Sequence, residues 1–352
     1  MVLPGPKAAS PIPAPPPPVA PAPHVPAVNV PKPAPAAPPT LPRVPKAPVP
    51  PLLPKGPPPP KLVPGGKAPG PGVIPPPGVV LPNLSGTAKN FPPGPEVNSP
   101  KLNIQGAPGA YSIALIEHVA FPNRTLYLPQ GVPAGVKVPI FAWENGICYQ
   151  YGRMYQGFLQ EIASHGYLVV VPGRPNELGK KGTTADWQLE SIAQARAWTT
   201  APFEVDKTKV AIAGHSCGGS ETLRNLGRTT SDQVTTGIVM NSAGQSEAYE
   251  DIDVPILLVH GGQTDTENRA DANFDWVSEN KEDTPIAEIG LQTGHLGSYW
   301  RPRGGIYAET VVRWLNWNLK GNANEKLYFS GGKESPAAKR GWQIKTNNIG
   351  DS

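Results

Sequence analysis

The chain has 352 residues, of which 49 are proline, and 37 of these prolines lie in the first 100 residues. Those 100 residues carry eight Lys or Arg and one acid, a net charge of +7, so the other 252 residues carry −3 of the overall +4. A uniform globular chain is therefore excluded. The sequence also has no run of 18 apolar residues, as a membrane-spanning helix would need, and too few cysteines for a disulfide framework or a four-cysteine zinc site.

Residues 1–100 are predicted to form a disordered, basic, Pro-rich arm. Pro, Ala, Val and Lys recur throughout residues 11–77, with four consecutive prolines at 15–18 and again at 57–60. Proline has a fixed φ and no amide donor, so such a segment is expected to be an extended, polyproline-like spacer. Three interpretations of the arm stay open: a tether without a specific partner, a docking segment for acidic polymers such as cell-wall polysaccharide, and a ligand for a proline-reading domain.

The N-terminus has no apolar segment of the length found in secretory signal peptides. The Pro-rich spacer and the two Asn-X-Ser/Thr sequons, at Asn83 and Asn123, nevertheless favour an extracellular or cell-wall location. That location is our prediction, and we expect no transmembrane segment and no nucleic-acid partner.

After residue 109 the pattern changes to apolar runs of strand length that alternate with helical segments. Such an alternation predicts a three-layer α/β domain with a mostly parallel sheet, which we place at residues 101–332, followed by a C-terminal tail at 333–352. Strands are predicted over 111–120, 124–128, 138–143, 167–171, 210–213, 237–240, 256–259 and 285–291, and helices over 154–164, 184–199, 268–277 and 307–320.

The motif Gly214-His215-Ser216-Cys217-Gly218 has the form G-x-S-x-G and follows a buried strand. A serine in this position sits on a sharp strand-to-helix turn that exposes its hydroxyl, and the flanking glycines avoid clashes with the neighbouring strand and helix. The Cys217 amide, at the start of the new helix, is the natural donor to a developing oxyanion. The alternative is a plain glycine-rich strand-to-helix turn, of which a phosphate-binding turn is one form. It is disfavoured because neither a Walker lysine nor a G-x-G-x-x-G spacing follows the strand.

A nucleophilic serine needs a base and an acid, and where a G-x-S-x-G turn carries the serine, the acid and then the histidine are expected to follow it along the chain. His260 precedes every plausible acid of the next loop, so His295, in a loop just beyond a predicted strand, is the expected base. Asp265 is the expected acid, because it lies a few residues after a strand end and can orient one tautomer of His295. Asp271 and Asp275 are the alternatives. We assign no chemical role to the other histidines, which are His118, His165 and His215.

The second half of an oxyanion hole is expected in the turn after the strand at 138–143. Asn145 and Gly146 form an Asn-Gly pair there, and such a turn can direct its amides toward the serine. Cys148 and Cys217 would then flank the same pocket. The two cysteines either form a disulfide that braces the hole or remain free thiols, because the sequence does not provide their separation.

These motifs resemble the α/β-hydrolase superfamily, in particular its dienelactone hydrolase, chlorophyllase and cutinase-like esterase branch in microbes. The likeness covers residues 105–332 and is carried by Asn-Gly-x-Cys at 145–148, Ala-Ser-His-Gly-Tyr at 163–167, Gly-x-Ser-Cys-Gly-Gly at 214–219 and Gly-His-x-Gly at 294–297. The resemblance implies the α/β-hydrolase fold, a Ser216, Asp265 and His295 triad, and neither cofactor nor metal. Glu144 departs from the pattern, since related sequences favour a small residue there, and its carboxylate is expected to repel acidic substrates.

The sequence therefore predicts a serine carboxylic-ester hydrolase that acts through an acyl-enzyme. Only about fifteen residues separate the runs at 237–240 and 256–259, which leaves no room for a cap domain, so the site is expected to accept bulky or polymeric esters. Two alternatives stay open: a peptidase that uses the same triad, and a non-catalytic wall- or surface-binding protein with a hydrolase-like body.

Overall fold

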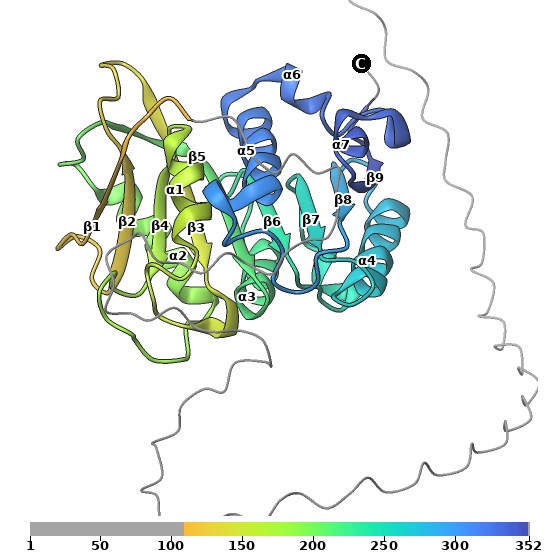
Figure 1. Cartoon of the computed structure of the whole chain (residues 1–352), viewed down its shortest axis with the longest axis horizontal. Coiled ribbons are helices and arrows are strands. Elements are labelled where there is room, and N and C mark those ends of the chain that lie inside the picture. Colours follow the sequence, from red (N-terminus) through yellow and green to blue (C-terminus); the bar gives the residue numbers. More distant parts are fainter. Residues whose placement is uncertain (1–108, 351–352) are drawn as a thin grey trace, which may run out of the picture. The chain divides into compact units, whose positions relative to one another are not determined.

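The computed structural model describes residues 109–350, apart from the side chains of Ser246 and Glu247. The predicted arm at 1–100 lies outside the described residues. Figure 1 shows the described part as a sheet with helices packed against it.

The strands form one nine-stranded sheet in the order β1-β2-β4-β3-β5-β6-β7-β8-β9. Pairing is parallel from β4 through β8 and antiparallel for the β1, β2 and β9 contacts at the two edges. The mostly parallel sheet flanked by helices that the sequence predicts is thereby confirmed. The strands are β1 (Ile113–Ile116), β2 (Arg124–Pro129), β3 (Lys137–Glu144), β4 (Leu168–Pro172), β5 (Glu204–His215), β6 (Thr236–Met240), β7 (Ile256–His260), β8 (Ile286–Gly290) and β9 (Gln343–Asn347).

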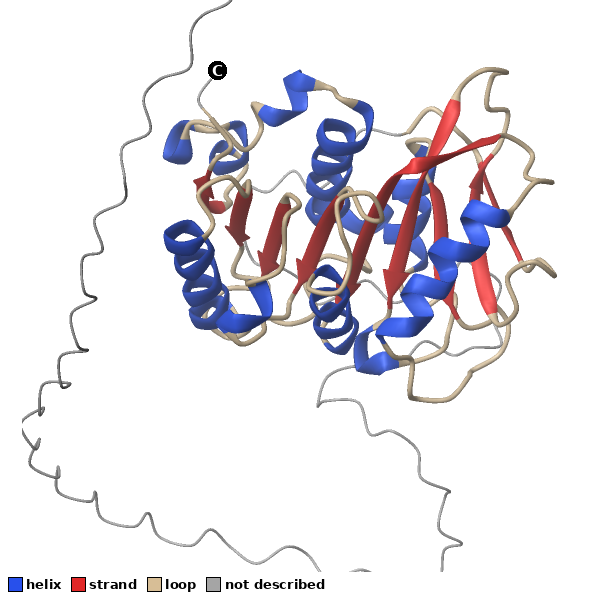
Figure 2. Cartoon of the chain, turned by 180° about the vertical axis from the view of Figure 1, so that it is seen from behind, coloured by secondary structure: helices blue, strands red, loops and turns tan. Residues whose placement is uncertain are grey.

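Helices cover both faces of the sheet (Figure 2). The α-helices are α1 (Gln156–Ser164), α2 (Ala185–Ala197), α3 (Cys217–Leu226), α4 (Glu267–Asn280), α5 (Gly305–Lys320), α6 (Ala323–Lys326) and α7 (Pro336–Lys339). Short 3-10 turns are η1 (Gly146–Cys148), η2 (Ser246–Tyr249), η3 (Pro302–Gly304) and η4 (Gly332–Glu334).

The central strands are apolar on both faces, which is why their sequences do not alternate with polar residues. On β5, Ala211 and Ala213 pack into a cluster with α1 and α5, whereas Val210 and Ile212 pack into a second cluster with α2, α3 and α4. This two-sided burial anchors the strands, so the polar residues that follow them are held at one edge of the sheet.

The C-terminal region differs from the prediction of a tail at 333–352. Residues Gln343–Asn347 form β9, which pairs with β8 in antiparallel register, and Trp342 and Ile349 are buried in the core. The segment Gln343–Asn347 has Ile344 as its one large apolar residue, so its sequence gives little sign of a strand. This segment becomes a strand because its backbone pairs with the free edge of β8, and not because its side chains follow a strand pattern.

Within residues 109–350, none of the helices combines the length and apolar character that crossing a membrane requires.

Candidate active site

Ser216 lies on the turn between β5 and α3, as the G-x-S-x-G motif predicts. Its backbone has φ 56° and ψ −118°, an unusual conformation for a residue other than glycine, and its amide donates to the carbonyl of Met240 at 3.0 Å. Such strain persists only where the surrounding structure enforces it, and it turns the hydroxyl out of the sheet edge.

The two flanking glycines are required by close backbone approaches. A Cβ at Gly214 would lie 2.2 Å from the carbonyl oxygen of Gly218, and a Cβ at Gly218 would lie 2.3 Å from the carbonyl oxygen of Glu144. Both distances are far below van der Waals contact, so side chains at these positions would push α3 away from the strands. The steric reason for the glycines that the sequence suggested is confirmed.

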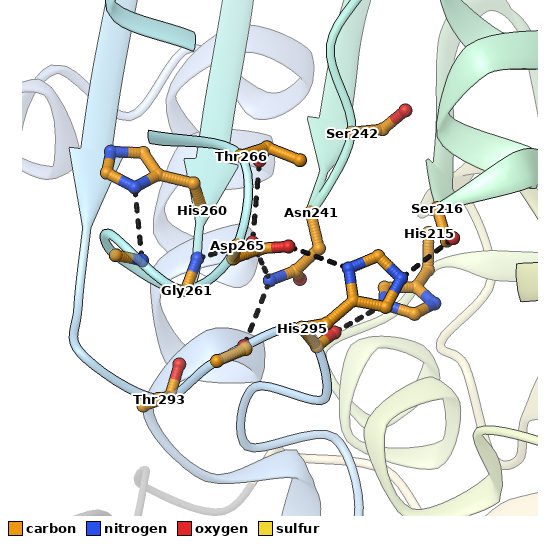
Figure 3. Close-up of polar contacts among 12 residues, drawn as sticks. His215, Ser216, Asn241, Ser242, His260, Gly261, Asp265, Thr266, Thr293 and His295 are labelled. Carbon is orange, nitrogen blue, oxygen red and sulfur yellow. Dashed lines mark hydrogen bonds and ion pairs between the residues drawn. The ribbon is translucent and has the colours of Figure 1, made fainter. Parts of the chain in front are cut away.

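A continuous hydrogen-bonded line joins the serine to an imidazole and a carboxylate (Figure 3). His295 Nε2 lies 2.8 Å from Ser216 Oγ, and His295 Nδ1 lies 2.6 Å from Asp265 Oδ1. Because the Asp265 carboxylate can only accept, Nδ1 carries the proton and Nε2 presents a lone pair to the serine hydroxyl. The structure thus brings together the three residues that the chain order selected, in the orientation that general-base activation of a serine requires.

Asp265 is held as a carboxylate by several donors. Its Oδ2 accepts from the Gly261 amide at 2.7 Å and from Asn241 Nδ2 at 2.8 Å. Burial alone would raise the pKa of Asp265, but the hydrogen bonds from His295, Gly261 and Asn241 outweigh it and lower that pKa to about 2. The acid therefore stays ionised next to His295 at any ordinary pH.

Asn241 is a site residue that the sequence analysis missed. It follows β6 directly, has a positive φ of 48°, and accepts from the Tyr299 hydroxyl at 2.6 Å while it donates to Asp265. A polar residue at the carboxyl end of a wholly apolar strand is the signal that could have identified it, because ligands and catalytic groups gather at that edge of a parallel sheet.

The rejected candidates lie elsewhere. Asp271, on α4, pairs with Lys345 of β9, and Asp275 is exposed on the same helix. His260 is buried and pairs with Glu288 at 3.0 Å, while its Nδ1 accepts from the Gly262 amide. No second carboxylate or imidazole of this group competes for the serine.

The turn after β3 packs against the start of α3. The Asn145 side chain points inward, where Nδ2 donates to the carbonyls of Tyr149 and Tyr151 and Oδ1 accepts from Trp143. The Gly146 amide donates to the Tyr155 hydroxyl at 3.2 Å. The Gly146 amide is therefore taken by Tyr155, in contrast to the prediction that it faces the serine, and the Asn145 side chain is held within the turn.

Other amides of the site remain available. The Cys217 amide belongs to the first turn of α3, where amides have no acceptor within the helix, and the Ile147 amide belongs to η1 in the turn after β3. Ile147 has a left-handed backbone with φ 52°, and it directly precedes the cysteine that is tied to Cys217. These two amides are the candidate oxyanion donors, because both belong to the segments that the disulfide joins beside the serine.

Cys148 and Cys217 form a disulfide, with a Cα separation of 5.3 Å. This outcome decides between the two alternatives that the sequence left open. The bond joins η1, in the turn after β3, to the first residue of α3 across 69 positions of sequence, and restricting an unfolded loop of that length stabilises the fold by about 4 kcal/mol. It also prevents the turn and the serine from moving apart.

Glu144 does not face the site, contrary to the expectation that it would repel acidic substrates. Its side chain is fully buried on the face of the sheet covered by α2 and α3, because Ala142, two residues earlier, packs into that cluster. Neither carboxylate oxygen has a hydrogen-bond partner among the described residues, and the Thr183 hydroxyl and Arg124 guanidinium only partly offset the effect of burial on the pKa of Glu144. Burial raises the pKa of Glu144 from its ordinary 4.5 to about 8.

This buried acid makes stability depend on pH. The folded state keeps a proton on Glu144 that the unfolded state releases above about pH 4.5, so stability should fall as the pH rises from about 4.5 to about 8. We expect the free energy of unfolding of Glu144→Gln not to fall over this pH range. In the wild type the fall should be on the order of a few kcal/mol, since one proton contributes about 1.4 kcal/mol per pH unit. Urea unfolding from pH 5 to 9 measures it. Glu177→Gln, at an exposed position, is the control, and parallel curves for wild type and Glu144→Gln would contradict the prediction.

Among the residues that the structure describes, no group of three or more His, Cys, Asp or Glu side chains is placed to bind a metal ion. Comparison with known proteins gives no assignment: no family model matches the chain, and no curated protein is similar to it.

Proposed function

We propose that the chain is a serine carboxylic-ester hydrolase with the α/β-hydrolase fold. The observation that carries the proposal is the line from Ser216 Oγ through His295 to Asp265, with both hydrogen bonds at or below 2.8 Å. The strained turn under Ser216 and the strand order of the sheet support the same assignment.

The mechanism follows from the atoms present. His295 Nε2 takes the proton from Ser216 Oγ as the oxygen attacks the ester carbonyl, and Asp265 stabilises the imidazolium that forms. The amides of Cys217 and Ile147 stabilise the tetrahedral oxyanion. His295 returns the proton to the leaving alkoxide, and water, activated by the same imidazole, then releases the acyl group from the serine.

The proposed substrates are bulky or polymeric esters. The segment between β6 and β7 holds η2 and no inserted domain, and the His295 side chain is 44 % exposed. An imidazole that remains open to solvent can meet an ester bond on a large molecule without opening a lid. Contact of the arm with cell-wall polysaccharide, and an extracellular location, stay predictions from the sequence.

A fluorophosphonate tests the proposed nucleophile directly. It should modify the full-length chain at about one site, Ser216, because only an activated hydroxyl reacts. Labelling should be absent in Ser216→Ala, strongly slowed in His295→Ala, and absent from the wild type after unfolding. Modification of another serine, or equal labelling of His295→Ala, would contradict the assignment. A panel of p-nitrophenyl esters, a suspended polyester and peptide amides then separates an esterase from a peptidase.

A further inference from the structure

His215 is buried directly before the serine and takes no part in the proton transfers described above. It is the last residue of β5, and the alternation along that strand places it on the face covered by α1 and α5. Its Nε2 lies 2.8 Å from the backbone carbonyl oxygen of His295, and its Nδ1 lies 2.7 Å from the hydroxyl of Tyr155. Figure 3 shows its contact with His295 beside the serine.

The donor and the acceptor of each of these hydrogen bonds can be assigned. A carbonyl oxygen can only accept, so His215 Nε2 carries the proton and donates it to His295. Nδ1 is then an acceptor, which takes the proton of the Tyr155 hydroxyl. The same hydroxyl oxygen accepts from the Gly146 amide at 3.2 Å. One polar chain therefore runs from Gly146 through Tyr155 and His215 to His295.

This chain joins separate parts of the proposed machinery. Gly146 belongs to the turn that carries the candidate oxyanion donor Ile147, Tyr155 is the residue before α1, and His215 is bonded to Ser216. The carbonyl that His215 holds belongs to the residue that contributes the general base. Together with the disulfide, these contacts tie the turn after β3 and the loop of His295 to the segment that carries the serine.

The neutral form of His215 is required for the chain. Burial, and then the nearby His295 ring, lower the pKa of His215 to about 3. Burial also raises the pKa of Tyr155, so its hydroxyl stays protonated. The His215 ring lies 4.8 Å from that of His295 between centroids and stays uncharged when His295 takes the serine proton. His215 therefore always donates a hydrogen bond to the His295 carbonyl and accepts one from the Tyr155 hydroxyl, and it does not act as a second base.

We infer that His215 and Tyr155 are positioning residues, which hold the oxyanion turn and the base loop in register with the nucleophile. The inference rests on the proposed function. These hydrogen bonds would act by aligning the reacting groups. Breaking them should therefore lower kcat and leave KM for a small ester nearly unchanged.

Three substitutions separate the links of the chain. Tyr155→Phe and His215→Gln both break the Tyr155–His215 link, and Tyr155→Phe also removes the acceptor of the Gly146 amide. The Gln amide still reaches the His295 carbonyl. His215→Asn breaks the link to the His295 carbonyl. The Oδ1 of the asparagine can replace His215 Nδ1 as the acceptor for Tyr155, but the shorter side chain has no donor that reaches His295. Tyr167→Phe is the matched control, since it removes an equally buried hydroxyl whose 2.7 Å hydrogen bond to Asn316 lies outside this chain.

Each of the three variants should lower kcat by about tenfold, with KM changed by less than about twofold. Tyr155→Phe combined with His215→Gln should be no worse than Tyr155→Phe alone, because the tyrosine variant already lacks the one link that His215→Gln breaks. Tyr155→Phe combined with His215→Asn should lose about a hundredfold, because the link to His295 is then broken in addition to the two that involve the Tyr155 hydroxyl. Tyr167→Phe should retain wild-type kcat.

A spectroscopic readout distinguishes positioning from general destabilisation. The low-field proton between His295 Nδ1 and Asp265 should shift or broaden in His215→Asn and remain in Tyr155→Phe and His215→Gln. If the wild type is active and no folded variant changes kcat by more than about twofold, the inference is refuted while the proposed function stands. If the wild type is inactive, the proposed function fails, and an unchanged low-field proton in His215→Asn would refute the inference separately.

Discussion

We expect the Ser216→Ala variant to turn over a short p-nitrophenyl ester slower than wild type by a factor on the order of 10³ or more. The physical reason is that the variant lacks the oxygen that lies 2.8 Å from His295 Nε2, so no acyl-enzyme forms. Oxyanion donors and binding remain, which leaves a small residual rate above that in water. Initial rates across a range of substrate concentrations measure kcat and KM.

The comparison needs a folded variant and a matched control. Alanine tolerates the positive φ of position 216 about as poorly as serine does, so the thermal midpoint should stay close to that of the wild type. Ser112→Ala, which removes an exposed hydroxyl bonded to Gln130, should retain full activity. Activity of Ser216→Ala within tenfold of the wild type would remove the serine from the mechanism.

The Asp265→Asn variant should lose a factor of about 10⁴ in kcat while keeping its fold. The amide can donate to His295 Nδ1, which the carboxylate cannot do. The imidazole then adopts the other tautomer, with its proton on Nε2 directed at Ser216 Oγ, and it cannot act as a base. The loss should be largest near neutral pH and shrink as hydroxide begins to compete at high pH.

Asp271→Asn provides the control for this experiment. It makes the same chemical change on the rival carboxylate of α4, whose partner is Lys345, and should leave kcat within about twofold. A large loss in Asp271→Asn together with a mild one in Asp265→Asn would reverse the assignment of the acid. Asp265 is expected to remain ionised throughout the usual assay range, since its pKa is lowered to about 2.

The sequence determined the features that depend on local pattern and chain order. Apolar runs of strand length predicted the central parallel strands, and the G-x-S-x-G motif with its glycines predicted the turn at Ser216. The order of acid and histidine after the serine selected Asp265 and His295, which lie together in the structure. These inferences succeed because a buried parallel strand must be apolar on both faces, and because polar groups that follow such strands meet at one edge.

Which side chains meet across the sheet could not be predicted, because it depends on the tertiary structure. Asn241 contacts Asp265, His215 joins Tyr155 to the His295 loop, and Glu144 is buried on the face covered by α2 and α3 without a hydrogen-bond partner among residues 109–350. The pairing of β9 with β8 and the disulfide between Cys148 and Cys217 are likewise contacts that the sequence could not predict. Each depends on the distance between residues remote in sequence, and a periodic pattern along one segment contains no information about that distance.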